Sequence, residues 1–242
     1  GRGTRLGSLP GRRVGPGLVD SPTRGLWGGC RDLYEVFPGL GAPLQAVLDG
    51  IAARAAITPK TDWIIAGPWR PFDRPGFGPR PCDMLDRIAP DHPVVVKDVS
   101  QHNLWLNSVA LSRAGISAET PDPPGGVIER DSTGTPTGIL IEAAGALVQR
   151  FLDPTTAQLD RAVSHMAATF HGLGITGFKE PMAFAPELAA YAKADRAGQL
   201  NLHVGAHLTR FSPFSEDWIA METLAALRAT HHSPNLHTGF AK

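Results

Sequence analysis

"LNLHVGAHL", residues 200–208, decides the fold class of this chain. Its apolar side chains alternate strictly with polar residues or glycine, so they all point to one side of an extended strand. The apolar row consists of Leu200, Leu202, Val204, Ala206 and Leu208. We therefore expect a strand over 200–208 with one face packed in a core.

Helical patterns lie on both sides of this strand. A capping box of Thr155 and Gln158 is expected to open the first helix. Its apolar residues recur at three and four positions: Leu159, Val163, Met166, Phe170 and Leu173. Pro186 and Gly198 suit the start and end of a second helix. The third is expected to be capped by Ser215 and to carry Trp218, Met221, Leu224 and Leu227.

Three further short apolar segments are expected to pair beside 200–208, near 16–20, 174–179 and 236–242. Strands and helices that alternate over short connections predict βα units and a parallel sheet. About three such units can be recognised, whereas eight close a (β/α)8 barrel. The predicted fold class is therefore α/β, a partial (β/α)8 TIM barrel interrupted in the middle.

Residues 38–150 have a different character and are expected to form an inserted α/β subdomain over the carboxyl ends of the strands. They are rich in loops, with a helix near 44–55, short buried strands at 62–67 and 93–98, a helix over 103–116 and a hairpin over 125–140. Residues 14–37 are assigned to the first barrel strand and its loop, and 151–242 to the βα units.

Composition excludes several classes of protein. The 242 residues carry no formal net charge, which does not favour binding to nucleic acid or to an anionic membrane. Cys30 and Cys82 lie far apart and outside any C-x-x-C pattern, so a disulfide scaffold or zinc ribbon is not expected. Apolar runs fall short of the roughly 20 residues of a membrane span, and the start of the chain has no apolar signal-peptide core. We expect a soluble, cytoplasmic chain.

Four stretches are similar to one known family. "GRRVGPGLVDSPTRGLWGG" (11–29) resembles the first barrel strand of the metal-dependent amidohydrolases, and "GLGITGFKEPM" (172–182) resembles the next. "PVVVKDVSQHNLWLNSVALSRAGI" (93–116) and "TPDPPGGVIERDSTGTPTGILIEAA" (120–144) resemble amidohydrolase family 3, the branch with the YtcJ-like proteins and N-substituted formamide deformylases. The resemblance implies hydrolysis of a non-peptide C–N bond in a small amide, and a divalent metal, usually zinc. Residues 1–13 are then disordered or a remnant of the family's composite β-sandwich.

The family's first strand ends in a Gly-Leu-Ile/Val-Asp-x-His-x-His pattern whose two histidines bind the metal. Asp20 and Ser21 match this pattern, but Pro22 and Arg24 stand at the two histidine positions. Proline has no donor atom and arginine keeps its proton. Because residues i and i+2 of a strand share a face, we expect both side chains to point to the same side, toward the barrel mouth. A sequence error, a decaying gene and a genuine loss of the metal would each produce this pattern.

Lys242 resembles the family's metal-bridging, carbamylated lysine, although a terminal lysine is more often solvated. The family's later histidines and its general base do not follow it. The resemblance therefore implies a hydrolase that, with these residues, is inactive and does not bind its metal. The alternative is a non-catalytic remnant that acts as a scaffold or binding module. A homo-oligomer is also compatible with the sequence.

Other candidate residues each have a structural alternative. The resemblance places His102 in the substrate pocket, with Asp98 orienting its imidazole; alternatively, both cap a helix that begins near Asn103. Glu180 follows a strand, where barrel catalytic groups collect, and is a weak candidate to contact substrate or metal-bound water. His203 and His207 lie roughly 13 Å apart along one strand, too far for one ion, and are expected to face solvent or a hydrogen-bond partner.

Overall fold

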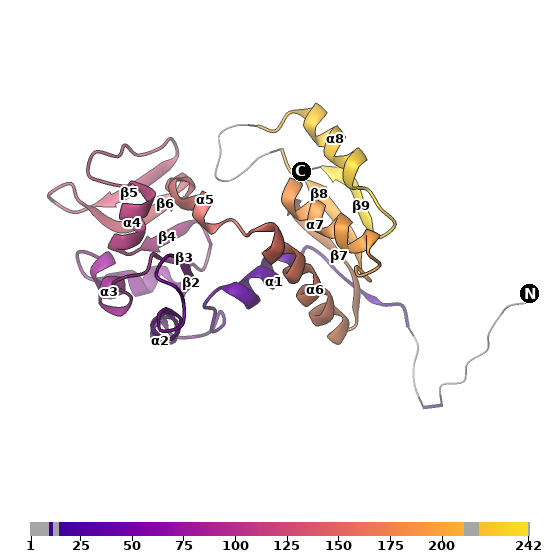
Figure 1. Ribbon diagram of the computed structural model, residues 1–242, viewed down its shortest axis with the longest axis horizontal. Helices are drawn as coiled ribbons and strands as arrows, with labels where there is room; N and C mark the ends of the chain where they lie inside the picture. The colour runs from indigo at the N-terminus through magenta and orange to yellow at the C-terminus, as the bar shows by residue number, and fades with distance from the viewer. Residues whose placement is uncertain (1–9, 12–14, 211–217, 242) are drawn as a thin grey trace, which may run out of the picture.

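Two β-sheets organise the chain (Figure 1). The computed structural model describes residues 10–11, 15–210 and 218–241. The first sheet is parallel throughout, in the order β1-β7-β8-β9. Its strands are β1 (Leu18–Asp20), β7 (Ile175–Ala183), β8 (His203–Leu208) and β9 (Leu236–Ala241). The predicted parallel strands are confirmed, and over the described residues they form an open sheet rather than a closed barrel.

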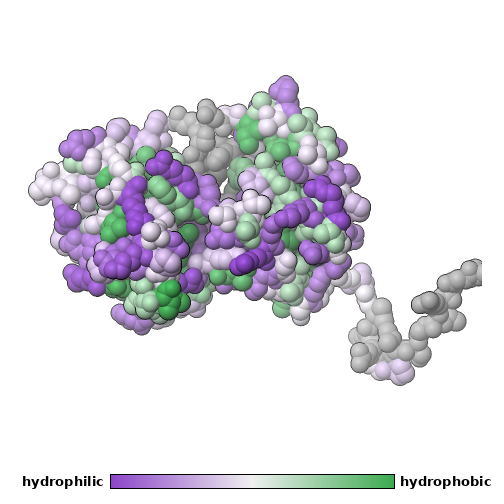
Figure 2. Space-filling model, in the orientation of Figure 1, coloured by the Kyte–Doolittle hydropathy of each residue, from purple (hydrophilic) through white to green (hydrophobic). Residues whose placement is uncertain are grey.

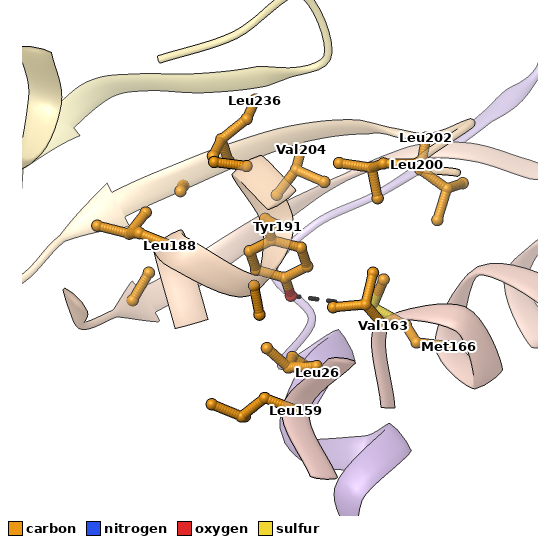
Figure 3. Close-up of a cluster of buried hydrophobic side chains, with 14 of the residues drawn as sticks. Leu26, Leu159, Val163, Met166, Leu188, Tyr191, Leu200, Leu202, Val204 and Leu236 are labelled. Atoms are coloured by element: carbon orange, nitrogen blue, oxygen red, sulfur yellow. Dashed lines mark hydrogen bonds between the residues drawn. The ribbon is translucent and has the colours of Figure 1, made fainter. Parts of the chain in front are cut away.

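Helices cover one face of this sheet. They are α1 (Gly25–Tyr34), α6 (Thr156–Gly172), α7 (Ala185–Arg196) and α8 (Met221–His231). Their apolar sides and the helix-facing side chains of the strands form one buried cluster. Figure 3 shows Tyr191 at its centre, between Leu26 below and Val204 and Leu236 above. The predicted apolar row of residues 200–208 belongs to this cluster.

The other side of the sheet, which we call the open face, is not covered by any helix of the described residues. Val19 on β1 is 72% exposed. A shallow groove of about 250 Å³ lies over this face, lined in part by Lys179, His203 and His237. In a complete barrel, this is the side that faces inward.

A second, mixed sheet has the order β2-β3-β4-β6-β5. Its strands are β2 (Ile64–Trp69), β3 (Val94–Asp98), β4 (Asn103–Leu106), β5 (Gly126–Arg130) and β6 (Pro136–Glu142). Only β2 and β3 pair in parallel; the other neighbours are antiparallel. The predicted strands at 62–67 and 93–98 and the hairpin near 125–140 are confirmed.

Both faces of the second sheet are packed, each against its own apolar cluster. The covering elements are α2 (Leu44–Ala55), η1 (Pro71–Phe77), α3 (Cys82–Ile88), α4 (Ser108–Ala114), η2 (Ala143–Gly145) and α5 (Ala146–Leu152). Burial on both sides explains why its strands read as continuous apolar runs.

The helix predicted over 103–116 is wrong in its first third. Residues 103–106 form β4, and the helix starts only at Ser108. Asn107 separates the two elements: its Oδ1 accepts hydrogen bonds from Val94 N at 3.0 Å and Ala110 N at 2.9 Å. Because successive residues of β4 pack on opposite faces, its apolar run does not alternate and mimics a helical pattern.

Two further expectations near helices need correction. Residues 14–37, expected as strand and loop, contain α1. The helix expected from Ser215 begins at Met221, and Trp218 lies before it, 65% exposed rather than in the core. Ser215 itself lies outside the described residues.

Contacts at the end of α1 join the two sheets. Lys97 Nζ lies 2.7 Å from Glu35 Oε1, and Val36 N donates to Ile65 O at 2.8 Å. Figure 1 shows the two parts side by side, and Figure 2 shows hydrophilic residues spread over both. Among the described helices, none combines the length and the apolar character needed to cross a bilayer.

The capping box of α6 gives a first prediction. Thr155 Oγ1 accepts a hydrogen bond from Gln158 N at 3.3 Å, and Gln158 Oε1 accepts one from Thr155 N at 2.8 Å. We expect Thr155→Ala to lower the free energy of unfolding by about 1 kcal/mol in urea titrations. Thr169→Ala is the control, because that hydroxyl only donates to His165 O within the same helix. Equal losses in the two variants would show that the cap contributes nothing specific.

Candidate functional site

The turn that follows β1 has an ordered backbone at the end of the parallel sheet, where a binding site can form. Thr23 N donates to Lys179 O at 3.0 Å, which ties the turn to β7. Thr23 Oγ1 donates to Asp20 Oδ2 at 2.5 Å. The carboxylate of Asp20 is therefore held by its own turn, at the end of the parallel sheet where barrel sites lie.

Pro22 and Arg24 lie beyond the end of β1, and both are exposed. The expectation that they share a strand face is therefore wrong, because the strand ends at Asp20. Arg24 directly precedes α1, and its guanidinium lies 5.4 Å from the centroid of the Trp27 ring. These two side chains do not fit a metal, since one has no donor atom and the other is a permanent cation.

Glu180 points into the helix-covered core and not to the open face. It alternates with Phe178 and Met182 on the buried side of β7, and it is only 1% exposed. Tyr191 OH donates to Glu180 Oε2 at 3.1 Å, whereas Oε1 has no hydrogen-bond partner. This placement does not support the contact with substrate or metal-bound water that we expected.

Burial decides the proton affinity of this carboxyl. It raises the pKa of Glu180 to about 7; the neighbouring Glu187 adds to the rise, while the Tyr191 hydroxyl and the Arg24 guanidinium oppose it. Burial also raises the pKa of Glu187. Sequence reasoning missed Tyr191 as a partner of Glu180, because a tyrosine on an apolar helix face is usually a core residue.

Asp98 organises the loop between β3 and β4. Its carboxylate accepts hydrogen bonds from Ser100 Oγ at 2.8 Å, His102 N at 3.1 Å and Asn103 Nδ2 at 2.7 Å. It bonds the backbone of His102 and not the imidazole. Asp98 therefore does not orient the ring, and Asn103 opens a strand rather than a helix. The placement of His102 in a substrate pocket stays a prediction.

The imidazole of His102 pairs instead with Glu142. His102 Nδ1 lies 2.8 Å from Glu142 Oε2, and both side chains are more than half exposed. Glu142 at the end of β6 and Gln101 beside His102 both have positive φ, 50° and 65°. Non-glycine residues rarely adopt that conformation, and they gather at binding sites. Sequence reasoning missed Glu142, whose only signal was a charge that ends an apolar strand.

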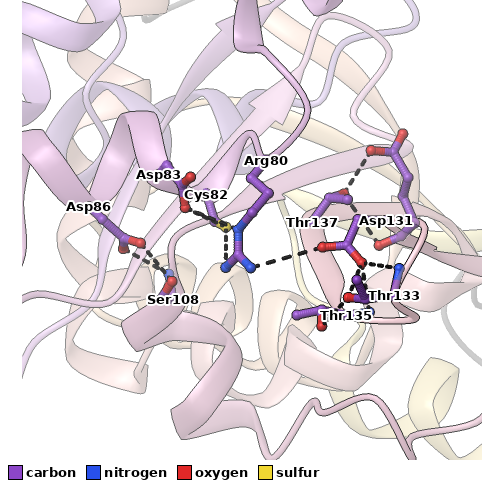
Figure 4. Close-up of polar contacts among 10 residues, drawn as sticks. Arg80, Cys82, Asp83, Asp86, Ser108, Asp131, Thr133, Thr135 and Thr137 are labelled. Atoms are coloured by element: carbon purple, nitrogen blue, oxygen red, sulfur yellow. Dashed lines mark hydrogen bonds and ion pairs between the residues drawn. The ribbon is translucent and has the colours of Figure 1, made fainter.

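One group of three side chains among the described residues brings its possible ligand atoms within 4.8 Å of one another: Cys82, Asp83 and Asp86 on α3. Figure 4 shows that its members already have protein partners. Asp86 Oδ2 accepts from Ser108 Oγ at 2.6 Å, and Arg80 Nε lies 3.2 Å from Asp83 Oδ1. This cluster joins α3 to α4 and lies in the second sheet's part of the chain, so we assign it a structural role. Lys242 lies outside the described residues.

The buried carboxyl of Glu180 predicts a pH-dependent stability. Its pKa is 4.5 when unperturbed and about 7 in the folded chain, so the folded state binds the proton more tightly. Its contribution to stability is complete below pH 4.5 and is lost as the pH rises through 7, by up to about 3 kcal/mol. We expect Glu180→Gln to abolish this loss in urea unfolding at pH 5 and pH 8. Glu222→Gln on exposed α8 is the control, and a pH dependence that persists in Glu180→Gln would refute the assignment.

The Asp98 loop predicts a contrast between neighbouring acids. Asp98→Ala leaves several donors without their shared acceptor, and we expect it to lower the free energy of unfolding by about 2 kcal/mol. Glu142→Ala removes one exposed ion pair and should cost less than about 1 kcal/mol. Thermal and urea unfolding of both variants test this, and a larger loss for Glu142→Ala would overturn the structural role of Asp98.

Comparisons with solved structures support the fold. A metal-dependent hydrolase from Pyrococcus horikoshii aligns with a TM-score of 0.60 at 18% identity, over 91% of this chain and 41% of its own. A metal-dependent hydrolase from Pyrococcus furiosus aligns with a TM-score of 0.57 at 19% identity, over 91% of this chain and 42% of its own. The α/β architecture is therefore that of a partial TIM barrel.

Comparisons with sequences identify the family. YtcJ of Bacillus subtilis, which is named as an amidohydrolase, is 31% identical over 90% of this chain and 42% of its own length. The N-substituted formamide deformylase of Arthrobacter pascens is 39% identical over 51% of this chain and 24% of its own length. This chain thus spans less than half the length of either relative. Residues 8–236 match the amidohydrolase family, in its branch 3. The chain therefore belongs to amidohydrolase family 3, a family of metal-dependent hydrolases.

Proposed function

We propose that this chain derives from hydrolases of non-peptide C–N bonds and, with the residues it has, is catalytically inactive. Family membership and the printed name of the deformylase relative support a small amide or N-substituted formamide as the substrate class. In the complete family enzymes a divalent metal, which we infer to be zinc, activates a water for attack on the amide carbon. The observation that carries the inactivity is the pair Pro22 and Arg24 at the end of β1.

Loss of ligands matters more here than repulsion by the new charge. A catalytic zinc normally has three protein ligands and a water, and two of the family's ligands would come from positions 22 and 24. Arg24 is exposed, so its repulsion of a divalent ion some 6 Å away is screened to about 1 kcal/mol. A metal would therefore be excluded mainly because the side chains at positions 22 and 24 offer it no ligand.

A non-catalytic scaffold or binding module is the second candidate function. It is favoured by the intact part of the chain around the second sheet, where the Asp98 loop is fully bonded and the His102–Glu142 pair is exposed. For either function we propose a small-molecule amide as the partner and a homo-oligomeric assembly. We also propose a cytoplasmic location, with which the free cysteines Cys30 and Cys82 are compatible.

Restoring the histidines tests the proposal. We expect neither the unaltered chain nor the double variant Pro22→His, Arg24→His to hydrolyse a panel of N-formyl and N-acyl amines in the presence of zinc and bicarbonate. Two imidazoles do not complete a catalytic set, and the Asp20 carboxylate beside them already accepts a hydrogen bond from Thr23. The measurement is amine release against a chelator-treated control.

The two chains separate the possible outcomes. Chelator-sensitive turnover by the unaltered chain would refute the inactivity. Turnover by the double variant alone would show that the lost histidines are the only defect and that the rest of the site is sufficient. Circular dichroism of both chains verifies that the substitutions leave the fold intact.

A further inference from the structure

We propose that three histidines at the start of β8 and β9 form a binding site for a divalent transition-metal ion, separate from the family's metal site. We call His203, His232 and His237 the histidine cluster. His203 is the first residue of β8, His237 is the second residue of β9, and His232 ends α8 just before β9. The ring centroids of His203 and His237 are 6.3 Å apart, and those of His232 and His237 are 5.9 Å apart.

These distances are within reach of a common ion. An imidazole nitrogen bonds zinc at about 2 Å, which puts the centres of two tetrahedrally arranged rings about 5 Å apart. The pairs His203–His237 and His232–His237 are therefore each roughly 1 Å too far apart. The rings of His203 and His237 are nearly parallel, at 23°, so at least one must rotate to turn its nitrogen toward the ion. All three side chains are exposed, and such side chains change rotamer easily.

The nitrogens of the cluster are free to take a new ligand. None of the three rings has a hydrogen bond or ion pair with another residue in the described part of the chain. Four other histidines of the chain do have polar partners: His92 with Thr58, His102 with Glu142, His165 with Asp32 and His171 with Asn201. The cluster therefore differs from the rest of the histidines in holding three unsatisfied imidazoles close together.

The backbone that carries the cluster is held firmly. Asp195 of α7 accepts hydrogen bonds from Ser233 Oγ at 2.5 Å and Asn235 N at 2.9 Å, and Asn235 O accepts from Val204 N at 2.8 Å. The segment 233–235 is thereby fixed to α7 and β8. Because His232 and His237 flank this segment, both are kept beside His203 without help from their own side chains.

The donor set indicates the class of ion. Neutral imidazoles bind zinc, copper and nickel and discriminate against magnesium and calcium, which prefer oxygen. Three ligands would leave at least one position to water. Because the rings must rotate and are exposed, we expect micromolar rather than nanomolar affinity. Lys179 also lines the groove over the open face, beside His203 and His237. Its ammonium group lies over the ring of Phe240, 5.9 Å from the centroid of that ring.

Titration of the full chain with zinc chloride tests this site. We expect one ion to bind, with chemical shift changes in the imidazole resonances of the three histidines. His237→Ala, which removes the ring shared by both close pairs, should weaken binding by roughly tenfold or more. His165→Ala is the matched control, as a half-buried histidine away from the cluster, and should bind as the unaltered chain does.

Several results would overturn the proposal. These are the absence of binding at millimolar zinc, equal affinity in His237→Ala, or loss of binding in Cys82→Ser instead. Thermal unfolding gives a second readout, since zinc should raise the midpoint of the unaltered chain and not that of His237→Ala. The proposed zinc site is tested by a binding measurement, whereas the proposed inactivity is tested by a hydrolysis assay. The two proposals can therefore fail independently.

Discussion

One-sided burial of the parallel sheet is the constraint on which the rest of the structure depends. Helices α1, α6 and α7 cover one face, and nearly every apolar side chain of β7 and β8 is used there. Glu180 is drawn into this face by strand alternation, so its carboxyl is buried beside Tyr191. The same alternation leaves Lys179, His203 and His237 on the open face, together with the exposed apolar side chains of Val19 and Phe240. Both the unusual proton affinity of Glu180 and the histidine cluster follow from this division.

Patterns with a single period were readable from the sequence. Strict alternation over 200–208 predicted β8 and the buried side of it, and Thr155 with Gln158 marked the start of α6. Prediction failed where both faces of a strand are buried, as in Asn103–Leu106, because packing on two sides removes the alternation. Prediction also failed for Pro22 and Arg24, because the rule that residues i and i+2 share a face applies only within a strand, and β1 ends at Asp20.

Sequence reasoning singled out the segment around Asp98 and His102 but not the side-chain contacts made there. The segment around Asp98 and His102 does form an ordered, polar corner, but the partner of His102 lies 40 residues away, on β6. A contact of that kind depends on the order of strands in the sheet, which periodicity does not encode. The histidine cluster was hidden for the same reason: its members come from α8, β8 and β9, and only the parallel register brings them together.

Survival of the fold is weak evidence for survival of the chemistry, and the turn after β1 shows why. Thr23 bonds β7 through its backbone and Asp20 through its hydroxyl, and neither bond depends on what stands at positions 22 and 24. Pro22 and Arg24 are both exposed and contribute little to the core. Substitutions at these two positions change the free energy of unfolding little, whereas a polar residue in place of Val204 or Tyr191 would lower it strongly. A barrel can therefore lose its metal ligands long before it loses its architecture, and function must be read from the side chains of the site.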